Sequence, residues 1–399
     1  MASSSPSGDD RPDLDRRTAS NILNRISNGM PPEPEHIEYV RVGREAEEHE
    51  ICEDGIEGME SLRYGNGQIF FVLGDFGYGK SFFINLIAEN AFEKNLARSE
   101  LDIPDVGNLS DKTEFYKKAV QNVRLPDERG SGLAQVLRKF CDEFDRDRLE
   151  ETAARRGFLG HSIYTILDDL LQVRDNGSVY VERDEQELEF RNVLSGAIGY
   201  LEGKNIALPE KHAIGKKGYD RIGNDGEDEY EYLKHIRSLI VELGYEGFVV
   251  LIDEVAEEMD WNPDDATTQR LIDLFNKSYQ KDQFSRMMFV FVGNAPKWDS
   301  LIEETGHGAL TDRYNAKKLE LSPLTKSDYE NLIHKVAWLV STADDVEINI
   351  NASEASEMVD TAIRAHGGES VSALSPRRLL LEPEGQDGPN LITVVRRYK

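Results

Sequence analysis

With 399 residues the chain is long enough for two or three domains, and its charge is strongly acidic. The 75 aspartate and glutamate residues outnumber the 47 lysine and arginine residues, so the formal net charge is −28. The two cysteines, Cys52 and Cys141, exclude a disulfide framework and a cysteine-based metal site. The apolar runs are too short to span a bilayer, and residues 1–15 lack the apolar core of a signal peptide, so we expect a cytoplasmic protein without a membrane partner.

The acidic excess is spread along the chain rather than gathered in a tail. This distribution indicates a halophilic host, in whose salt-rich cytoplasm acidic surfaces stay hydrated and their mutual repulsion is screened. The alternative is an acidic protein that never meets nucleic acid, since negative charge repels nucleic acid at long range.

The N-terminal region is predicted to consist of a disordered segment and two helices. Residues 1–16 have a disordered composition, and a short helix follows that ends at Gly29. The box Val42–Glu45, which reads Val-Gly-Arg-Glu, then leads into an acidic helix that reaches about Leu62.

The most specific motif of the chain begins at Gly74 and has the pattern G-x-x-x-x-G-K-S. It lies between an apolar strand and an apolar helix that starts near Phe82, which is the setting a phosphate-binding loop requires. The residues of the motif are Gly74, Asp75, Phe76, Gly77, Tyr78, Gly79, Lys80 and Ser81. Backbone N–H groups and Lys80 would bind the phosphates, and the Ser81 hydroxyl would bind Mg²⁺. The sequence therefore predicts a nucleoside triphosphate site, the alternative being an ordinary glycine-rich turn.

From Ile69 onward strands and helices alternate, which predicts an α/β fold with the three-layer parallel sheet of a P-loop NTPase. The strands expected after the first are Phe248–Ile252, Met287–Val292 and Lys317–Leu321. Asp253, after the second strand, would hold Mg²⁺ through water, and Glu254 would polarise the attacking water. The alternative is that both are ordinary acidic loop residues.

Three further polar residues are candidates for catalysis or nucleotide sensing. Asn294 follows the strand that we expect between the other two, where an amide would orient the water; the alternative is a turn residue. Arg313 precedes the last strand and would act in trans as an arginine finger. Arg377 would touch the phosphates in cis from the first turn of a helix. Either arginine is alternatively a surface residue in a salt bridge.

The predicted domains are an ATPase core over residues 17–323 and a small helical lid over residues 324–399. A helical insertion interrupts the core at about 105–232, and it contains a polar, acidic loop at Glu202–Glu231. The lid opens with the capping signature Thr325–Asp328.

The order of these features resembles an AAA+ ATPase of the initiator-like and STAND-like branch. More specifically, the chain is similar to the ATP-binding proteins of BREX phage-defence systems. The stretches that carry the likeness are Asn24–Pro31, Val42–Glu45, Leu73–Phe83, Gly244–Glu254, Leu321–Thr325 and Ser375–Arg377. The resemblance implies that Val42, Gly43 and Arg44 contact the nucleotide base. It also implies that the motif Gly74–Ser81 is a Walker A loop, which binds ATP together with Phe82. Asp253 and Glu254 would form the Walker B pair that serves Mg²⁺ and the attacking water.

It also implies a Mg²⁺-dependent ATPase that couples nucleotide state to the assembly or remodelling of a defence complex acting on DNA. Expected partners are other BREX proteins and a second copy of the chain, with DNA reached through partners. One alternative is an origin initiator, which would append a winged helix, although only about twenty residues follow Arg378. The other is a nucleotide-gated scaffold with little hydrolysis, against which Glu254 argues.

Overall fold

The computed structural model describes residues 14–52, 67–102, 112–156, 161–215, 229–253, 284–294, 317–368, 370–386 and 388–398. The chain divides into two compact units, each assembled from separate stretches of sequence. The first, here called the loop unit, is drawn from residues 1–46, 74–89 and 321–399. The second, the sheet unit, is drawn from residues 47–73 and 90–320.

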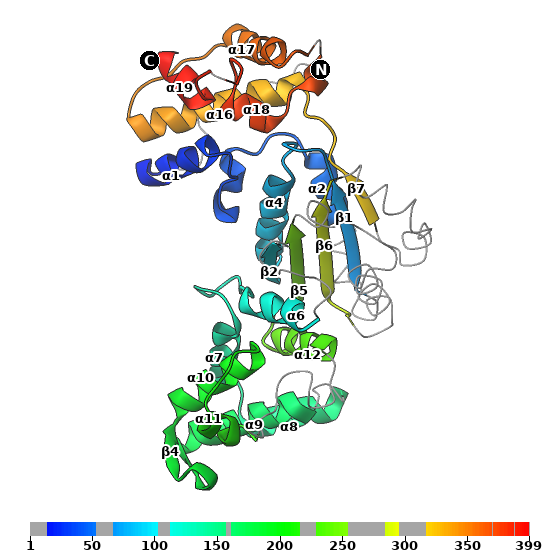
Figure 1. Ribbon diagram of the computed structural model, residues 1–399, viewed down its shortest axis with the longest axis vertical. Helices are drawn as coiled ribbons and strands as arrows, with labels where there is room; N and C mark the ends of the chain where they lie inside the picture. The colour runs from blue at the N-terminus through cyan, green and yellow to red at the C-terminus, as the bar shows by residue number, and fades with distance from the viewer. Residues whose placement is uncertain are drawn as a thin grey trace. The chain divides into compact units, whose positions relative to one another are not determined.

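The sheet unit is built on five parallel strands in the spatial order β2-β5-β6-β1-β7 (Figure 1). The strands are β1 (Gln68–Leu73), β2 (Ala97–Asp102), β5 (Phe248–Asp253), β6 (Met287–Gly293) and β7 (Lys317–Glu320). β1, β5 and β6 are near-continuous apolar runs with buried side chains, as is typical of the central strands of a parallel sheet. The α/β fold predicted from the sequence is confirmed, and β6 lies between β5 and β1 as expected.

The register of the sheet brings the carboxyl ends of its central strands to one edge. Leu73, the last residue of β1, lies opposite Gly293 at the end of β6. On the other side of β6, Ile252 of β5 lies opposite Phe291. Polar residues that follow these strands therefore share an edge, which in open parallel sheets is where ligands bind.

Strand β2 is absent from the sequence-based prediction, because Arg98 and Glu100 interrupt its apolar residues. In the structure Arg98 is only 2 % exposed. Its guanidinium carbon lies 3.7 Å from the centre of the Phe92 ring, and its Nε lies 3.1 Å from the Glu100 carboxylate. An aromatic face and an opposite charge thus compensate a buried cation on a strand that pairs with β5.

The insertion is largely helical, as expected, but it also contains a β-hairpin. Its helices are α6 (Lys112–Gln121), α7 (Leu133–Glu143), α8 (Arg146–Arg156), α9 (His161–Asn176), α10 (Phe190–Leu201) and α11 (Leu208–Ala213), and α12 (Glu229–Glu242) follows. The hairpin joins β3 (Ser178–Val181) and β4 (Gln186–Glu189) through η4 (Glu182–Asp184). The prediction of a loop over Glu202–Glu231 is corrected, since α11 lies within it and α12 begins before its end; residues 216–228 lie outside the described ranges.

The loop unit is helical. Its elements are α1 (Arg16–Ser27), η1 (Pro34–Tyr39), α16 (Lys326–Asp344), α17 (Ala352–Ala365), η5 (Val371–Ala373), α18 (Pro376–Leu381), α19 (Leu391–Val395) and η6 (Arg396–Tyr398), and both α2 (Glu45–Ile51) and α4 (Lys80–Glu93) begin in it. The predicted capping signature is confirmed, because the Thr325 side chain accepts from Asp328 N–H and the Asp328 carboxylate accepts from Thr325 N–H. Buried residues of α1 share one apolar core with α16, α17, α18 and α19.

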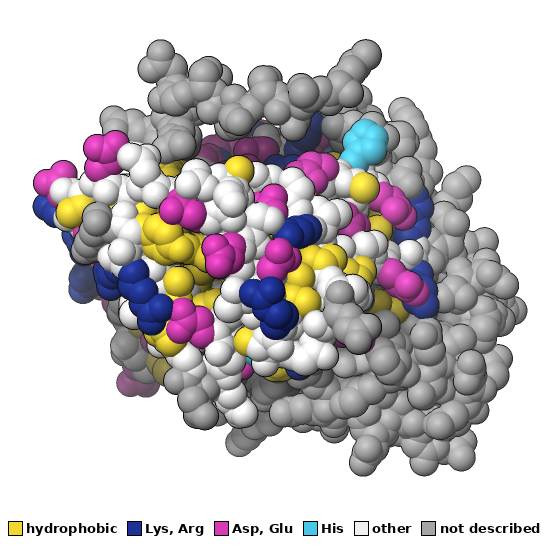
Figure 2. All heavy atoms as spheres, turned by 90° about the horizontal axis from the view of Figure 1, so that it is seen from above, with side chains coloured by type: hydrophobic (Ala, Val, Ile, Leu, Met, Phe, Trp, Pro, Cys, Tyr) yellow, Lys and Arg dark blue, Asp and Glu magenta, His cyan; other side chains and the backbone are white. Residues whose placement is uncertain are grey.

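Charged side chains of both signs are distributed over the surface. In the view from above, acidic and basic side chains are interspersed, with apolar atoms between them, and neither sign gathers in one place on that face (Figure 2). Within the described ranges, no helix combines the length and the hydropathy needed to cross a bilayer.

Candidate functional site

The phosphate-loop motif follows β1 directly, and α4 begins at its lysine. Gly77 and Gly79 have φ angles of +84° and +88°, in the left-handed region that favours glycine. A Cβ atom at Gly77 would also lie 2.8 Å from the Ser375 hydroxyl oxygen. Of the three glycines of the motif, Gly77 and Gly79 are therefore required by the backbone conformation, and Gly77 by space as well.

The carbonyl groups of the loop are engaged by donors from within the loop unit. Lys80 Nζ donates to Gly74 O at 3.1 Å and to Asp75 O at 3.3 Å. The Tyr78 carbonyl accepts from Arg44 Nη2 at 2.9 Å, and the Gly79 carbonyl accepts from the N–H of the fourth residue along, at 2.9 Å. These four carbonyl oxygens are thus directed at protein donors and not at the anion site.

Unlike these carbonyl groups, two N–H groups of the loop have no hydrogen-bond partner among the described residues. In the part of the chain that the structure describes, the N–H groups of Gly77 and Gly79 donate no hydrogen bond. Loop N–H groups without a protein acceptor can donate to an anion, and the first turn of α4 adds its own N–H groups. The exposed Ser81 hydroxyl lies in that turn. This arrangement fits a phosphate group.

Arg377 lies beside the phosphate loop, in the first turn of α18. Its guanidinium carbon is 5.3 Å from the centre of the Phe76 ring, and that ring is 67 % exposed. Arg377 is itself exposed, and it makes no hydrogen bond or ion pair with another described residue. The structure thus brings together Arg377 and the loop, two features that the sequence analysis places in one site, and the guanidinium retains its hydrogen-bonding capacity.

The Val-Gly-Arg-Glu box also contacts the loop. Arg44 is only 7 % exposed, and its guanidinium donates to Tyr78 O and, at 2.5 Å, to Ser322 O. Val42 is partly buried and packs against the apolar core that α1 shares with the C-terminal helices.

Two candidate residues lie at the carboxyl edge of the sheet unit. Asp253 is the last residue of β5 and is half-buried, and Asn294 directly follows β6. Asn294 Oδ1 is buried and has no hydrogen-bond partner among the described residues. Because buried polar atoms are almost always paired, such an oxygen is suited to a water molecule or a ligand group.

Glu254 and Arg313 fall in ranges that the structure does not describe, namely residues 254–283 and 295–316. Across the described ranges, no three His, Cys, Asp or Glu side chains are grouped as a metal site. Protein-bound Mg²⁺ commonly keeps several waters and binds substrate phosphates, so its sites need few protein ligands.

Two hydrogen bonds at or near the loop could not be predicted from the sequence. Ser322 accepts from Arg44 across 278 residues, and Ser372 O accepts from the Tyr78 hydroxyl at 3.3 Å across 294 residues. Each acceptor is a backbone carbonyl, which carries no residue-specific signal.

The sequence of the chain matches the model of one known protein family. The family model described as BREX system ATP-binding protein BrxC/D matches residues 14–382, nearly the whole chain. No curated protein matches the sequence of this chain.

Proposed function

Because the chain belongs to the BREX system ATP-binding protein BrxC/D family, we propose that it binds ATP with Mg²⁺ in the phosphate loop and hydrolyses it. The observation that carries the proposal is the polarity of the loop. Four of its carbonyl groups are held by Lys80, Arg44 and α4, while the N–H groups of Gly77 and Gly79 make no hydrogen bond within the described residues. A loop with this polarity favours anions and would repel a cation.

Lys80 and the start of α4 supply the positive charge. The Lys80 ammonium donates to two neutral carbonyl oxygens, and a phosphate oxygen can replace either as a stronger, charged acceptor. The positive end of the α4 dipole points at the same place, since α4 begins at Lys80.

Residues at or just after the ends of the strands would help to bind the metal and to orient the attacking water. When bound, Mg²⁺ would supply positive charge that stabilises the charge developing on the transferred phosphate. The Ser81 hydroxyl would bind it directly and Asp253 through water. Glu254 would accept the proton of the attacking water, and Asn294 Oδ1, which has no partner among the described residues, would orient that water.

Two arginines would couple hydrolysis to assembly. Arg377 would leave the Phe76 ring and bind the γ-phosphate in cis, which links the C-terminal helices to the nucleotide. Arg313 of one copy would complete the site of a second copy, an effect worth about 10³ or more in rate in related chemistry. The nucleotide cycle would then drive assembly or remodelling of a BREX defence complex that reaches DNA through its other proteins.

The deciding experiment compares wild type with Glu254→Gln in ATP binding and in turnover. We expect the variant to bind Mg·ATP as wild type does and to hydrolyse it at least about 100-fold more slowly, since it lacks the proton acceptor. Asp253→Asn should shift the Mg²⁺ requirement to higher concentration. Equal, background-level turnover by wild type and Glu254→Gln would replace the ATPase with a nucleotide-gated scaffold.

The trans role of Arg313 has a separate test. Arg313→Ala should bind ATP normally and hydrolyse it poorly, and mixing it with Lys80→Met should restore part of the turnover. Without rescue in the mixture, and with a wild-type specific rate that is independent of protein concentration, the site is complete within one chain.

A further inference from the structure

The side chain of Arg44 joins three parts of the loop unit that are far apart in the sequence. It belongs to the Val-Gly-Arg-Glu box, and its guanidinium donates to Tyr78 O in the phosphate loop and to Ser322 O just before α16. We propose that Arg44 is a positioning residue, which holds the peptide between Tyr78 and Gly79 in the orientation that turns the Gly79 N–H toward the phosphates. This inference rests on the proposed function of the loop.

The geometry of the peptide bond carries the argument. A peptide unit is planar and trans, so its C=O and its N–H point in opposite directions. The C=O of Tyr78 is directed at Arg44 Nη2, 2.9 Å away. The N–H of Gly79, on the same peptide, is therefore directed away from Arg44, and it donates to no described residue. Rotation of this peptide would turn a carbonyl oxygen toward the phosphates and repel them.

The peptide has freedom to rotate without such a restraint. Gly77 and Gly79 lie on either side of Tyr78, and glycine populates both signs of φ readily. The same flexibility that permits the left-handed conformation of both glycines makes alternative loop conformations accessible. A fixed donor on the outer side of the loop reduces these alternatives to one.

Arg44 is suited to this task by its chemistry and its burial. Guanidinium is a planar fork of five N–H donors, which can serve two carbonyl groups at once, and it stays charged. The residue is 7 % exposed, so water does not compete for its donors. Its backbone has φ +78°, a strained value for a residue with a side chain, which persists only where the surrounding contacts hold it.

The hydrogen bond to Ser322 O holds the Arg44 guanidinium in place while it donates to Tyr78 O. Ser322 O lies between β7 and α16, and α16 opens with a capping box that fixes its first turn. Arg44 therefore links the phosphate loop to the segment that enters the C-terminal helices.

The experiment uses inorganic triphosphate, which has the phosphates of ATP and no base. A residue that positions the loop should affect ATP and triphosphate equally, whereas a residue that contacts the base should affect ATP alone. We expect Arg44→Ala to weaken both ligands by the same factor of about 10 to 100 in calorimetric titrations with Mg²⁺. Arg44→Lys keeps the charge but not the fork, so its loss should be smaller and again equal for both ligands.

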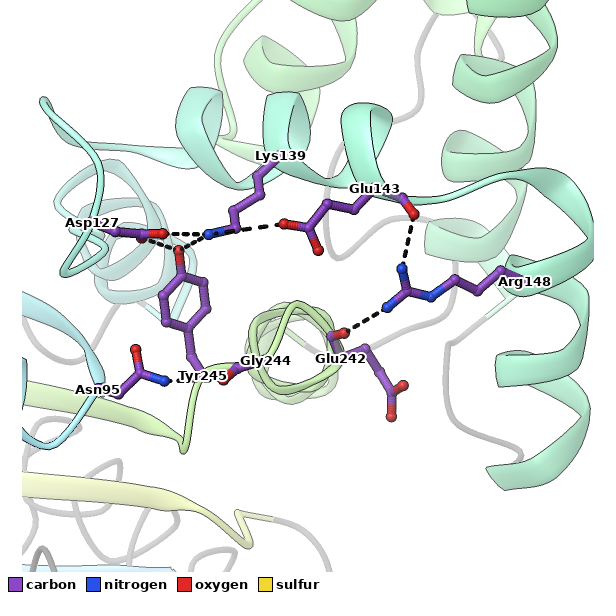
Figure 3. A network of polar contacts seen from close by, with 8 residues as sticks. All are labelled: Asn95, Asp127, Lys139, Glu143, Arg148, Glu242, Gly244 and Tyr245. Carbon is purple, nitrogen blue, oxygen red and sulfur yellow. Dashed lines mark hydrogen bonds and ion pairs between the residues drawn. The ribbon is translucent and has the colours of Figure 1, made fainter.

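Arg148 provides a matched control. It also donates to two carbonyl oxygens, Glu143 O at 2.8 Å and Glu242 O at 3.4 Å, but within the sheet unit (Figure 3). Arg148→Ala should leave the affinity for both ligands unchanged. Low millimolar guanidinium ion should restore triphosphate affinity to Arg44→Ala, which a general loss of stability would not allow, and it should not restore Lys80→Met.

The outcomes are distinct. Loss of ATP affinity with triphosphate affinity unchanged would overturn the positioning role in favour of a base contact. Unchanged affinity for both ligands in Arg44→Ala would overturn it outright. If Arg44→Ala does not fold, as judged by its melting curve, the Arg44→Lys titrations decide by the same two comparisons. Failure of wild type to bind either ligand would instead overturn the proposed function, and this inference with it.

Discussion

The phosphate loop and the polar network around Lys139, which Figure 3 shows, are each organised by a lysine, but the hydrogen-bond partners described here for the two lysines differ. Lys80 donates to two backbone carbonyl oxygens. Lys139 donates to the Asp127 carboxylate at 2.5 Å and to the Tyr245 hydroxyl at 2.8 Å, and the same hydroxyl donates to Asp127. The Lys139 ammonium also lies 4.8 Å from the centre of the Tyr245 ring.

The members of the network shift one another's pKa values. Burial alone would lower the pKa of Lys139, but hydrogen bonds with Asp127 and Tyr245 raise it overall. Burial and the hydrogen bond to Asp127 raise the pKa of Tyr245 to about 12. An anionic ligand that took Lys139 would leave the Asp127 carboxylate without its cation, whereas one that takes Lys80 would replace its hydrogen bonds to the neutral carbonyl oxygens of Gly74 and Asp75. A hydrogen bond from a lysine to a neutral carbonyl oxygen is therefore given up to an anion at lower cost than one to a carboxylate.

The largest expected effect that tests this comparison is that of Lys80→Met. It should lower ATP affinity by at least about 100-fold, since charged hydrogen bonds to phosphate are lost, and leave the melting temperature nearly unchanged. Calorimetric titration and a melting curve measure the two quantities. Wild-type affinity in the variant would mean that this loop does not bind the nucleotide.

Molar potassium chloride should act on the whole molecule rather than on either lysine. The net charge of −28 repels itself, and salt shortens the Debye length to about 3 Å at 1 M. We expect the melting temperature to rise by about 5 °C between dilute buffer and molar salt, which corresponds to about 4 kcal/mol for a chain of this length. A melting temperature that stays flat or falls would count against a salt-adapted protein.

Lys139→Met should show the reverse of the Lys80 result. Loss of the cation leaves Asp127 and Tyr245 without their shared donor, so we expect about 1–2 kcal/mol less stability and a melting temperature lower by a few degrees. ATP affinity should stay at the wild-type value. If Lys139→Met lost ATP affinity at unchanged stability, the distinction between the two lysines would be wrong.

The smallest expected effect is a pH dependence of the network. Burial would raise the pKa of Asp127, but hydrogen bonds from Lys139 and Tyr245 outweigh it and hold the pKa below its ordinary value of 3.8. A lowered pKa in the folded state stabilises the fold above pH 3.8, and this contribution is lost as the pH falls through the folded-state pKa. The stability difference between wild type and Asp127→Asn should therefore be constant from pH 7 to 5 and shrink below about pH 4. A difference that does not change with pH would show that Asp127 is not ionised in the network.

The parts of the fold that follow from local sequence are those with a strong local signal. The runs that form β1, β5 and β6 are apolar throughout, and Thr325 and Ser375 are caps that one segment specifies alone. The left-handed turn at Glu185 has neither glycine nor asparagine to mark it, so the hairpin β3–β4 stays hidden in a region of helices.

The candidate site also has a part that local sequence predicts and a part that depends on the fold. The motif from Gly74 to Ser81 predicts the loop and its lysine, because phosphate binding needs those residue types in that order. The position of Arg44 over the Tyr78 carbonyl depends on packing between segments that are distant in the chain, and it could not be predicted from spacing. The buried, unpartnered oxygen of Asn294, a property of the described residues around it, likewise emerges only from the fold.

The discontinuous make-up of the loop unit has a consequence for the newly made chain. Tyr78 and its acceptor Ser372 are separated by 294 residues, which a ribosome synthesises in about 15 to 60 seconds. During that time the phosphate loop lacks its C-terminal contacts, and the apolar face of α1 lacks the helices that bury it. Nascent chains should therefore acquire nucleotide affinity late, after the C-terminal helices have left the ribosome, and until then they depend on chaperones to shield α1.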